Sequence, residues 1–243
     1  MQTKAVELAG VSRRFGQLVA LEGLDLRIRA QEVTAVVGPS GCGKSTLLEL
    51  VAGLQEPDAG RVQVGGSAER RAACAYMPQQ DLLLPWRDAL GNAALALECG
   101  GASKAGARRR AEPLFARFGL ADFERTRPAA LSGGMRQRVA FLRTLLPGRP
   151  VLLLDEPFAS LDSLTRASMQ QWLADALATE PRTVLLVTHD VEEAAFLADR
   201  IVVLSARPGR PVAEFEIDLP RPRSLADPML ARLKADAMEA LRR

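Results

Sequence analysis

The sequence predicts an α/β fold in which a largely parallel sheet is covered by helices on its faces. Short apolar runs alternate with segments of helical pattern, and a glycine-rich turn follows one of these runs. Strands that alternate with helices pair in parallel, because each helix returns the chain to the same end of the sheet. The expected strands are 24–28, 33–37, 61–64, 73–77, 151–154, 183–187 and 200–204, with 212–219 as one further strand.

Helical regions accompany these strands. The first, 44–52, is stopped by Gly53, and a second, 132–146, is capped by Ser132. Residues 86–120 are rich in Ala, Leu and Arg and contain no β-branched residue, which predicts a mostly helical insertion broken around Gly100-Gly101 and Gly106. Residues 226–243 are expected to form an exposed helix at the C-terminus.

Composition limits the function classes. The chain has 243 residues, a hydrophobic fraction of 48% and a net charge of +3, which is ordinary for a globular protein and gives no strong case for a nucleic-acid partner. Cys42, Cys74 and Cys99 are scattered, which favours reduced thiols over a disulfide framework or a zinc site. The apolar runs are too short to span a bilayer, and the first ten residues lack the apolar segment of a secretory signal. If the protein serves a membrane, another subunit must provide the pore.

The glycine-rich turn carries the first chemical motif. It reads Gly38-Pro39-Ser40-Gly41-Cys42-Gly43-Lys44-Ser45-Thr46 and matches the complete phosphate-binding P-loop pattern. Glycines allow backbone N–H groups to close around phosphates, and the start of the following helix adds positive potential. Lys44 is expected to reach the β- and γ-phosphates of ATP, and Ser45 to hold Mg²⁺.

A pair of acidic residues ends a later strand. The strand 151–154 is followed by Asp155 and Glu156, and such residues lie at the carboxyl edge of a parallel sheet, beside the P-loop. We expect Asp155 to complete the Mg²⁺ site and Glu156 to polarise the attacking water. Acids at a strand end are common, so the P-loop is what makes this pair informative.

The segment from Leu131 to Arg138, Leu-Ser-Gly-Gly-Met-Arg-Gln-Arg, resembles the signature of ATP-binding cassette (ABC) ATPases. Ser132, Gly133 and Gly134 at a helix N-terminus make a second surface for an anion. One nucleotide cannot occupy two such surfaces of one chain. The resemblance implies that this surface faces the P-loop of a second, identical subunit, so that a homodimer encloses two ATP molecules.

The remaining positions of the resemblance are also present. It implies that Phe15 stacks on adenine, that Gln79 touches Mg²⁺ and the attacking water, and that Asp162, in Ser160-Leu161-Asp162, serves the opposite active site. Gln80 adjoins Gln79, so the register at that position can slip by one. It also implies that His189, the only histidine of the chain, contacts the γ-phosphate. Phe15 and the histidine each have an ordinary structural alternative, a core aromatic and a structural imidazole.

The resemblance implies a single ABC ATPase domain over 1–243. Residues 1–85 and 128–205 are expected to form a P-loop NTPase core, with a mixed or parallel sheet and an antiparallel β subdomain. Residues 86–127 with the signature helix are expected to form a helical subdomain, and 206–243 a C-terminal strand and helix. Pro78 and Pro147-Gly148 depart from the common family pattern without touching the ATP site.

Two functions of different class fit these motifs. The favoured one is the ATPase subunit of an importer, peripheral to the cytoplasmic face of the membrane, with a permease and a solute-binding protein as partners. Residues Leu82–Trp86 are apolar in a loop expected to be partly exposed, which favours permease contact, although a core position for Trp86 is the alternative. The other function is a soluble ABC ATPase acting on nucleic acid or ribosomes, which the run Arg108–Arg110 could suggest. That run is more typical of a solvated helix face.

The solute class is also indicated by resemblance. Leu82–Trp86, with Asp88 and Asn92, is similar to the nitrate, sulfonate and taurine importer group, which also includes importers of thiamine-pyrimidine and riboflavin precursors. The segments 207–210, Arg-Pro-Gly-Arg, and 218–223, Asp-Leu-Pro-Arg-Pro-Arg, are similar to the same group. Met77–Asp81 leans slightly towards the pyrimidine-precursor branch.

Overall fold

The computed structural model describes residues 5–221, 223 and 227–242. The chain separates into two compact units, which are described one at a time. The first comprises 1–76, 150–156 and 170–243, and the second comprises 77–149 and 157–169.

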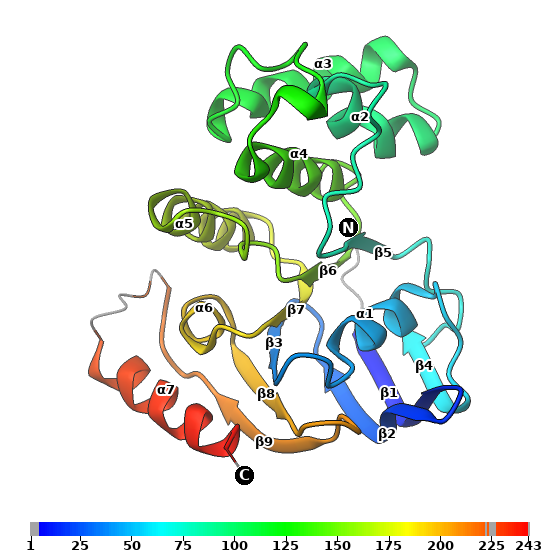
Figure 1. Cartoon of the computed structure of the whole chain (residues 1–243), viewed down its shortest axis with the longest axis vertical. Coiled ribbons are helices and arrows are strands. Elements are labelled where there is room, and N and C mark those ends of the chain that lie inside the picture. The colour runs from blue at the N-terminus through cyan, green and yellow to red at the C-terminus, as the bar shows by residue number, and fades with distance from the viewer. Residues whose placement is uncertain (1–4, 222, 224–226, 243) are drawn as a thin grey trace. The chain divides into compact units, whose positions relative to one another are not determined.

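The first unit contains a six-stranded sheet with the order β5-β6-β7-β3-β8-β9 (Figure 1). Strands β6, β7, β3 and β8 are mutually parallel, and β9 runs antiparallel to β8 at one edge. The predicted α/β class is therefore confirmed, and every predicted strand of this sheet exists, with ends that coincide or differ by at most three residues. The bounds are Val33–Val37 (β3), Cys74–Met77 (β5), Val151–Asp155 (β6), Thr183–Thr188 (β7), Arg200–Leu204 (β8) and Pro211–Glu216 (β9).

A second, antiparallel sheet has the order β2-β1-β4, with β1 at Val6–Phe15, β2 at Leu18–Ile28 and β4 at Ala59–Val64. The sequence prediction missed β1 entirely and began β2 six residues late. The alternation of β1 changes phase: Val6, Leu8 and Val11 are all buried, and the pairing with β2 shifts register between Leu8 and Val11. Gly10 lies in this irregularity with φ of +60°. A strict period of two cannot detect a strand whose inward face changes parity at a bulge.

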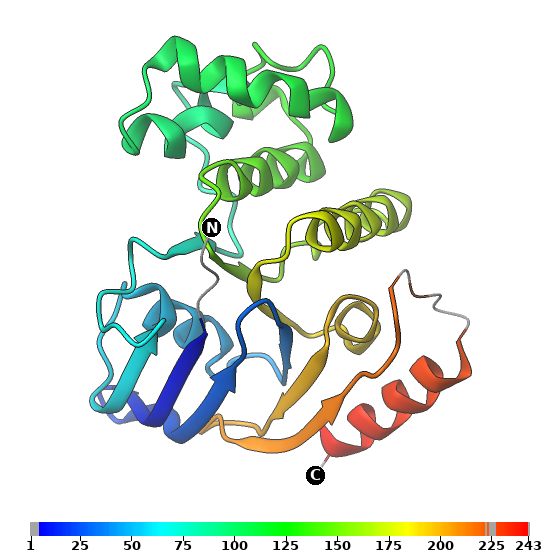
Figure 2. The ribbon, with the colours of Figure 1, turned by 180° about the vertical axis from the view of Figure 1, so that it is seen from behind.

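Helix α1 (Lys44–Ala52) contacts strands of both sheets, so the main core of this unit lies around it. The buried face of α1 is formed by Leu47, Leu48, Leu50 and Val51, which pack with Leu21 and Leu24 of β2 and with Leu153, Leu185 and Val202 of the larger sheet. This packing holds the start of α1 at one edge of the parallel strands. Helix α6 (Val191–Leu197) contacts β3 and β7, and α7 (Pro228–Ala240) contacts α6 and β9 (Figure 2). Ala226 and Arg243, the ends of the predicted helix, lie outside the described residues.

The second unit is helical, as the composition of 86–120 predicted. Its helices are α2 (Ala89–Cys99), α3 (Lys104–Arg117), the 3₁₀ turn η1 (Pro128–Ala130) and α4 (Gly133–Leu145), and α5 (Ser163–Thr179) begins in it. Phe141 lies between Phe118 and Phe158, with ring centroids 6.1 and 5.8 Å away, at the centre of its apolar core. In the described ranges, no helix is long and apolar enough to cross a membrane.

The predicted break at Gly100-Gly101 is confirmed, but the break at Gly106 is wrong. Helix α3 begins at Lys104, and the Ser103 hydroxyl accepts a hydrogen bond from the Gly106 amide at 3.2 Å. Gly106 therefore lies in the first turn, where amides have no intrahelical partner and a capping side chain serves them instead. Arg109 and Arg110 are exposed on this helix, as expected for a solvated face.

Candidate functional site

Three parallel strands of the first unit end at the same edge of the sheet. Val37 of β3 pairs with Thr188 of β7, and Asp155 of β6 pairs with Val187. The P-loop, Glu156 and His189 each follow directly after one of these strands. The register alone therefore brings together three groups that the sequence placed more than 30 residues apart.

The P-loop joins β3 to α1, and its backbone conformation at position 43 strongly favours glycine. Gly43 has φ of +104°, and a Cβ there would lie 2.8 Å from the Ala20 carbonyl oxygen. Gly43 is also the N-cap of α1, and no side chain caps this helix start. Gly43 therefore contributes no side chain that would cover the start of α1, and an exposed helix N-terminus of this kind can bind an anion.

Lys44 is the first residue of α1 and its side chain turns back over the loop. Its ammonium donates hydrogen bonds to the carbonyl oxygens of Gly38 at 2.8 Å and Pro39 at 2.9 Å. The residue is buried, with a relative exposure of 6%. The positive charge is therefore held inside the curve of the P-loop.

Asp155 is buried at the end of β6 and receives a hydrogen bond from the Ser45 side chain. Burial raises the pKa of Asp155, and the hydrogen bond from Ser45 only partly opposes it. Tyr76 of β5 also hydrogen-bonds Asp155, and burial together with this carboxylate raises the Tyr76 pKa. The sequence prediction missed Tyr76. Its position one residue before the end of the strand that precedes Gln79 was the available signal.

Glu156 and His189 meet at this edge. The His189 Nδ1 atom lies 3.2 Å from a Glu156 carboxylate oxygen, and the imidazole is 59% exposed while the carboxylate is 14% exposed. Glu156 has a left-handed backbone with φ of +48°, and its amide donates to the Val187 carbonyl at 2.8 Å. Left-handed backbone in a non-glycine residue costs of order 1 kcal/mol and is concentrated at functional sites. The strained turn directs the glutamate towards the histidine.

Phe15 ends β1 and is 43% exposed, so it is not a core aromatic. The guanidinium of Arg13 lies over its ring, 5.0 Å from the centroid. Arg13 is itself held by Asp58 at 2.8 Å and by Gln55 at 3.0 Å. One face of the ring is therefore covered by a fixed cation, a contact that the sequence did not reveal.

The other predicted site residues lie in the second unit. Ser132 is the N-cap of α4, as predicted, and its hydroxyl accepts from the Met135 amide at 3.2 Å. Gln79 and Gly133 line one pocket of about 380 Å³, together with Gln80, Arg136 and Ser160. Asp162 is exposed and accepts a hydrogen bond from the Thr165 amide at 3.0 Å, which lowers the pKa of its carboxyl group. Residues as far apart in the sequence as Gln79 and Ser160 thus meet around the start of α4.

Comparison with known protein families shows to which family the chain belongs. The ABC transporter family matches residues 21–159, more than half of the chain. The chain belongs to the ABC transporter family. Membership confirms the predicted α/β cassette fold, ATP binding and ATPase activity.

Relatives of this ABC protein match most of its length. An aliphatic sulfonates import ATP-binding protein of Mesorhizobium japonicum is 43% identical over 98% of the chain and 89% of its own length. A formylaminopyrimidine import ATP-binding protein of Halalkalibacterium halodurans is 47% identical over 81% of the chain and 78% of its own length. These relatives confirm the resemblance to the sulfonate and pyrimidine-precursor importer group.

Solved structures agree with the ABC assignment. A dimeric ATP-binding cassette in a post-hydrolysis state, bound to ADP and phosphate, is 31% identical and has a TM-score of 0.80, covering 88% of this chain and 99% of that one.

The ABC chain also presents an apolar segment in its second unit. Leu82 and Trp86 are exposed by 57% and 70%, so the alternative of a core tryptophan is wrong. The buried side chain of Asn92 holds the loop from both sides: it accepts from the Leu84 amide at 2.7 Å and donates to the Leu84 and Asp88 carbonyls at 3.1 Å each. The exposed tryptophan therefore stands on a fixed loop.

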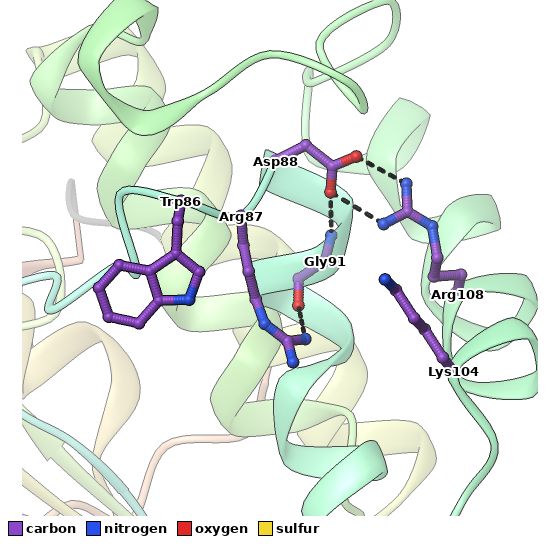
Figure 3. A pocket seen from close by; sticks show the side chains of 6 residues that line it. All are labelled: Trp86, Arg87, Asp88, Gly91, Lys104 and Arg108. Atoms are coloured by element: carbon purple, nitrogen blue, oxygen red, sulfur yellow. Dashed lines mark hydrogen bonds and ion pairs between the residues drawn. The ribbon is translucent and has the colours of Figure 1, made fainter.

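A pocket of about 360 Å³ adjoins Trp86 (Figure 3). Arg108 reaches from α3 to the start of α2, where it forms two hydrogen bonds of 2.9 and 2.8 Å with Asp88. This ion pair lowers the pKa of Asp88. Lys104 projects into the same space from the first turn of α3. Trp86 thus lies at the border of a pocket that charged side chains line.

Proposed function

We propose that this chain is the ATP-hydrolysing subunit of an importer for a small solute of the sulfonate, nitrate and taurine type or the pyrimidine-precursor type. The observation that carries the catalytic part is the shared sheet edge at which Asp155 ends β6 and the P-loop, Glu156 and His189 follow paired strands. The importer part is supported by relatives that are named import ATP-binding proteins and match up to 98% of the chain.

In this proposal ATP binds with its phosphates in the loop Gly38–Thr46. The uncapped start of α1 and the buried Lys44 ammonium provide the positive environment that phosphates need. Phe15 stacks on the adenine with the ring face that Arg13 leaves open. Such stacking is worth of order 1 kcal/mol.

The residues present fit a Mg²⁺ ion. The Ser45 hydroxyl and the Asp155 carboxylate already face each other in a hydrogen bond, and a hydroxyl with a carboxylate is the donor set that Mg²⁺ takes beside phosphates. Gln79 from the second unit is proposed as a further ligand. When bound, the ion neutralises charge on the phosphates.

Hydrolysis then depends on Glu156 and His189. Glu156 accepts a proton from the water that attacks the γ-phosphorus, and the phosphorus–oxygen bond to ADP breaks as the new one forms. His189, 3.2 Å from the Glu156 carboxylate, orients that carboxylate and contacts the γ-phosphate from the end of β7. Lys44 stabilises the negative charge on the transferred group.

The second nucleotide surface belongs to a partner subunit. We propose that Ser132, Gly133, Gly134 and Asp162 act on the ATP held by the P-loop of the other copy in a head-to-tail homodimer. The matched cassette structures described as dimeric support this arrangement.

The proposed membrane partner is a permease that binds the segment Leu82–Trp86 from the cytoplasmic face. A large exposed aromatic on a fixed loop beside a pocket is typical of a protein-binding surface. A solute-binding protein completes the system and selects the solute, and nucleic acid is not proposed as a partner.

Two measurements test the proposal. Purified chain should hydrolyse ATP with Mg²⁺, whereas Lys44→Ala should not; normal turnover of this variant would refute the role of the P-loop. The cognate solute-binding protein should then be screened by calorimetry against taurine, alkylsulfonates, nitrate and hydroxymethylpyrimidine compounds. Tight binding of a sugar or an amino acid alone would overturn the solute class and leave the ATPase untouched.

A further inference from the structure

The turn between β8 and β9, residues 205–210, is closed on itself by three hydrogen bonds. The Ser205 amide donates to the Arg210 carbonyl at 2.9 Å, the Ser205 hydroxyl donates to the Pro208 carbonyl at 2.8 Å, and the Arg210 amide donates to the Ser205 hydroxyl oxygen at 3.1 Å. A turn with this many internal hydrogen bonds holds its side chains in defined directions.

This turn lies directly against the P-loop. The Gly209 amide donates to the Ala20 carbonyl of β2 at 2.9 Å, and a Cβ at Gly209 would lie only 2.2 Å from the Cys42 carbonyl oxygen. The backbone of the turn therefore touches the backbone of the P-loop with no side chain between them.

Arg207 makes the polar contact between the two loops. Its Nε atom donates to the Gly41 carbonyl oxygen at 2.9 Å, and a Cβ at Gly41 would lie 2.7 Å from a terminal nitrogen of the same guanidinium. Gly41 has φ of +75°, so its backbone favours glycine independently of this contact. The guanidinium of Arg207 thus hydrogen-bonds the Gly41 carbonyl and also packs against the Gly41 Cα.

The peptide that Arg207 holds is part of the phosphate cradle. In a trans peptide the carbonyl of one residue and the N–H of the next point in opposite directions. A Gly41 carbonyl fixed towards Arg207 therefore turns the Cys42 amide towards the interior of the loop, where it lies 3.3 Å from the Pro39 carbonyl oxygen. That same carbonyl accepts from the Lys44 ammonium.

We propose that Arg207 is a positioning residue of the nucleotide site, which fixes the Gly41–Cys42 peptide in its phosphate-binding orientation. The proposal rests on the proposed binding of ATP at the P-loop. Because the contact preorganises binding and touches none of the groups assigned to the chemical step, its loss raises the KM for ATP and leaves kcat nearly unchanged.

The test compares Arg207→Ala with Arg210→Ala, which is in the same turn. Arg210 is also exposed, but its guanidinium pairs with Glu22 of β2 instead of the P-loop. Dissociation constants for ATP and ADP are measured by calorimetry on the isolated chain, beside steady-state hydrolysis. Arg207→Ala is expected to weaken both nucleotides about tenfold, the loss of one charge-assisted hydrogen bond, with kcat within twofold. Arg210→Ala is expected to bind as the parent does.

Two further measurements separate positioning from general damage. Arg207→Lys keeps a charged donor and is expected to restore the dissociation constant to within about threefold of the parent. The melting temperature of nucleotide-free Arg207→Ala should match that of Arg210→Ala. Parental affinity in Arg207→Ala, equal weakening in Arg210→Ala, or a fall in kcat with unchanged KM would each overturn the proposal. None of these results would affect the P-loop assignment, which Lys44→Ala tests separately.

Discussion

At the scale of single residues, the pair of Glu156 and His189 shows how the fold builds chemistry from local geometry. Each follows a strand that is buried along its whole length, and the register of β6 and β7 brings them to 3.2 Å. Glu156 is the first residue after β6, and its positive φ turns the chain away from the strand direction. Packing of the sheet therefore supports a strained residue at the position where the proposed mechanism places a proton acceptor.

Replacement of Glu156 by glutamine separates binding from chemistry. The amide keeps the shape of the side chain but accepts protons poorly, so Glu156→Gln is expected to retain ATP affinity and to lose at least 100-fold in kcat. ATP should then trap the dimer, which gel filtration with and without ATP would reveal. Glu192→Gln, an exposed glutamate of α6 paired with Lys234, is the matched control and should turn over normally. A monomeric Glu156→Gln protein that hydrolyses ATP at the parental rate would contradict the assigned role.

At the scale of elements, the sequence was most informative where periodicity and burial agree. Strands β3, β6, β7 and β8 are buried on both faces, and they read as unbroken apolar runs. Strand β1 was missed because its inward residues change phase at a bulge, and the break at Gly106 was wrong because Ser103 caps that turn. A local pattern cannot report a partner strand, whereas the Ser103 cap is a local signal of the kind that identified Ser132 and could have been recognised.

The same limit applies to the site. The P-loop, the two acids, the signature and the histidine could be proposed from the sequence because short motifs carry them. The contacts of Tyr76 with Asp155, of Arg13 with Phe15 and of Arg207 with Gly41 join residues that no motif links. These contacts depend on sheet order and on register, which one sequence does not reveal.

An ion cluster around the buried pair of Glu32 and Arg200 ties the start of β3 to β8 and β9. Arg200 donates to Glu32 at 2.8 Å and to Glu214 at 2.9 Å, and Thr34 donates to Glu32 at 2.7 Å. Burial alone would raise the pKa of Glu32, but the hydrogen bonds from Thr34, Arg200 and the Arg29 amide, together with the charge of Arg200, outweigh it and lower the pKa. A lowered pKa in the folded state stabilises the fold above the unfolded value of about 4.3, and this contribution is lost as the pH falls through the folded pKa.

Glu32→Gln is therefore expected to lower the free energy of unfolding by about 2 kcal/mol at pH 7, because Arg200 loses a charged, buried partner. The difference from the parent should shrink as the pH falls below about 4.3, where the parental carboxylate also takes up a proton. Urea unfolding followed at several pH values measures both effects. Glu22→Gln, at the exposed pair with Arg210, should change stability little. A loss that is independent of pH would contradict the role of the ionised Glu32.

The loop that carries Trp86 also leads to a testable prediction about permease binding. Because Asn92 holds the loop within its own unit, Trp86→Ala should leave ATP hydrolysis by the isolated chain unchanged. Affinity for the reconstituted permease should fall at least tenfold, as for a buried aromatic anchor of an interface. Leu54→Ala, an apolar residue of the first unit that is 53% exposed, is the control. Parental affinity of Trp86→Ala for the permease would move the docking surface elsewhere.

At the scale of the whole molecule, the proposed active site is larger than one chain. The P-loop, Glu156 and His189 lie in one unit, whereas Ser132 caps a helix of the other unit. If the signature acts on the nucleotide of a partner subunit, Ser132→Arg should abolish hydrolysis in the pure variant, because a bulky cation fills the anion surface. ATP should still bind to the P-loop of this variant as it does to the parent.

A mixing experiment then decides between action in trans and action within one chain. In a mixed dimer of Ser132→Arg and Lys44→Ala chains, the P-loop of the first faces the signature of the second, and both of those surfaces are intact. One complete site is thus restored although each pure variant is inactive, and the mixture should recover a substantial part of the parental rate. If the signature served its own chain, no pairing would combine an intact P-loop with an intact signature, and the mixture would stay as inactive as its components. The ATPase rate is measured at several mixing ratios, with the pure variants as controls. A rate that rises as the two variants approach equal proportions is evidence for a head-to-tail dimer in which the signature acts in trans.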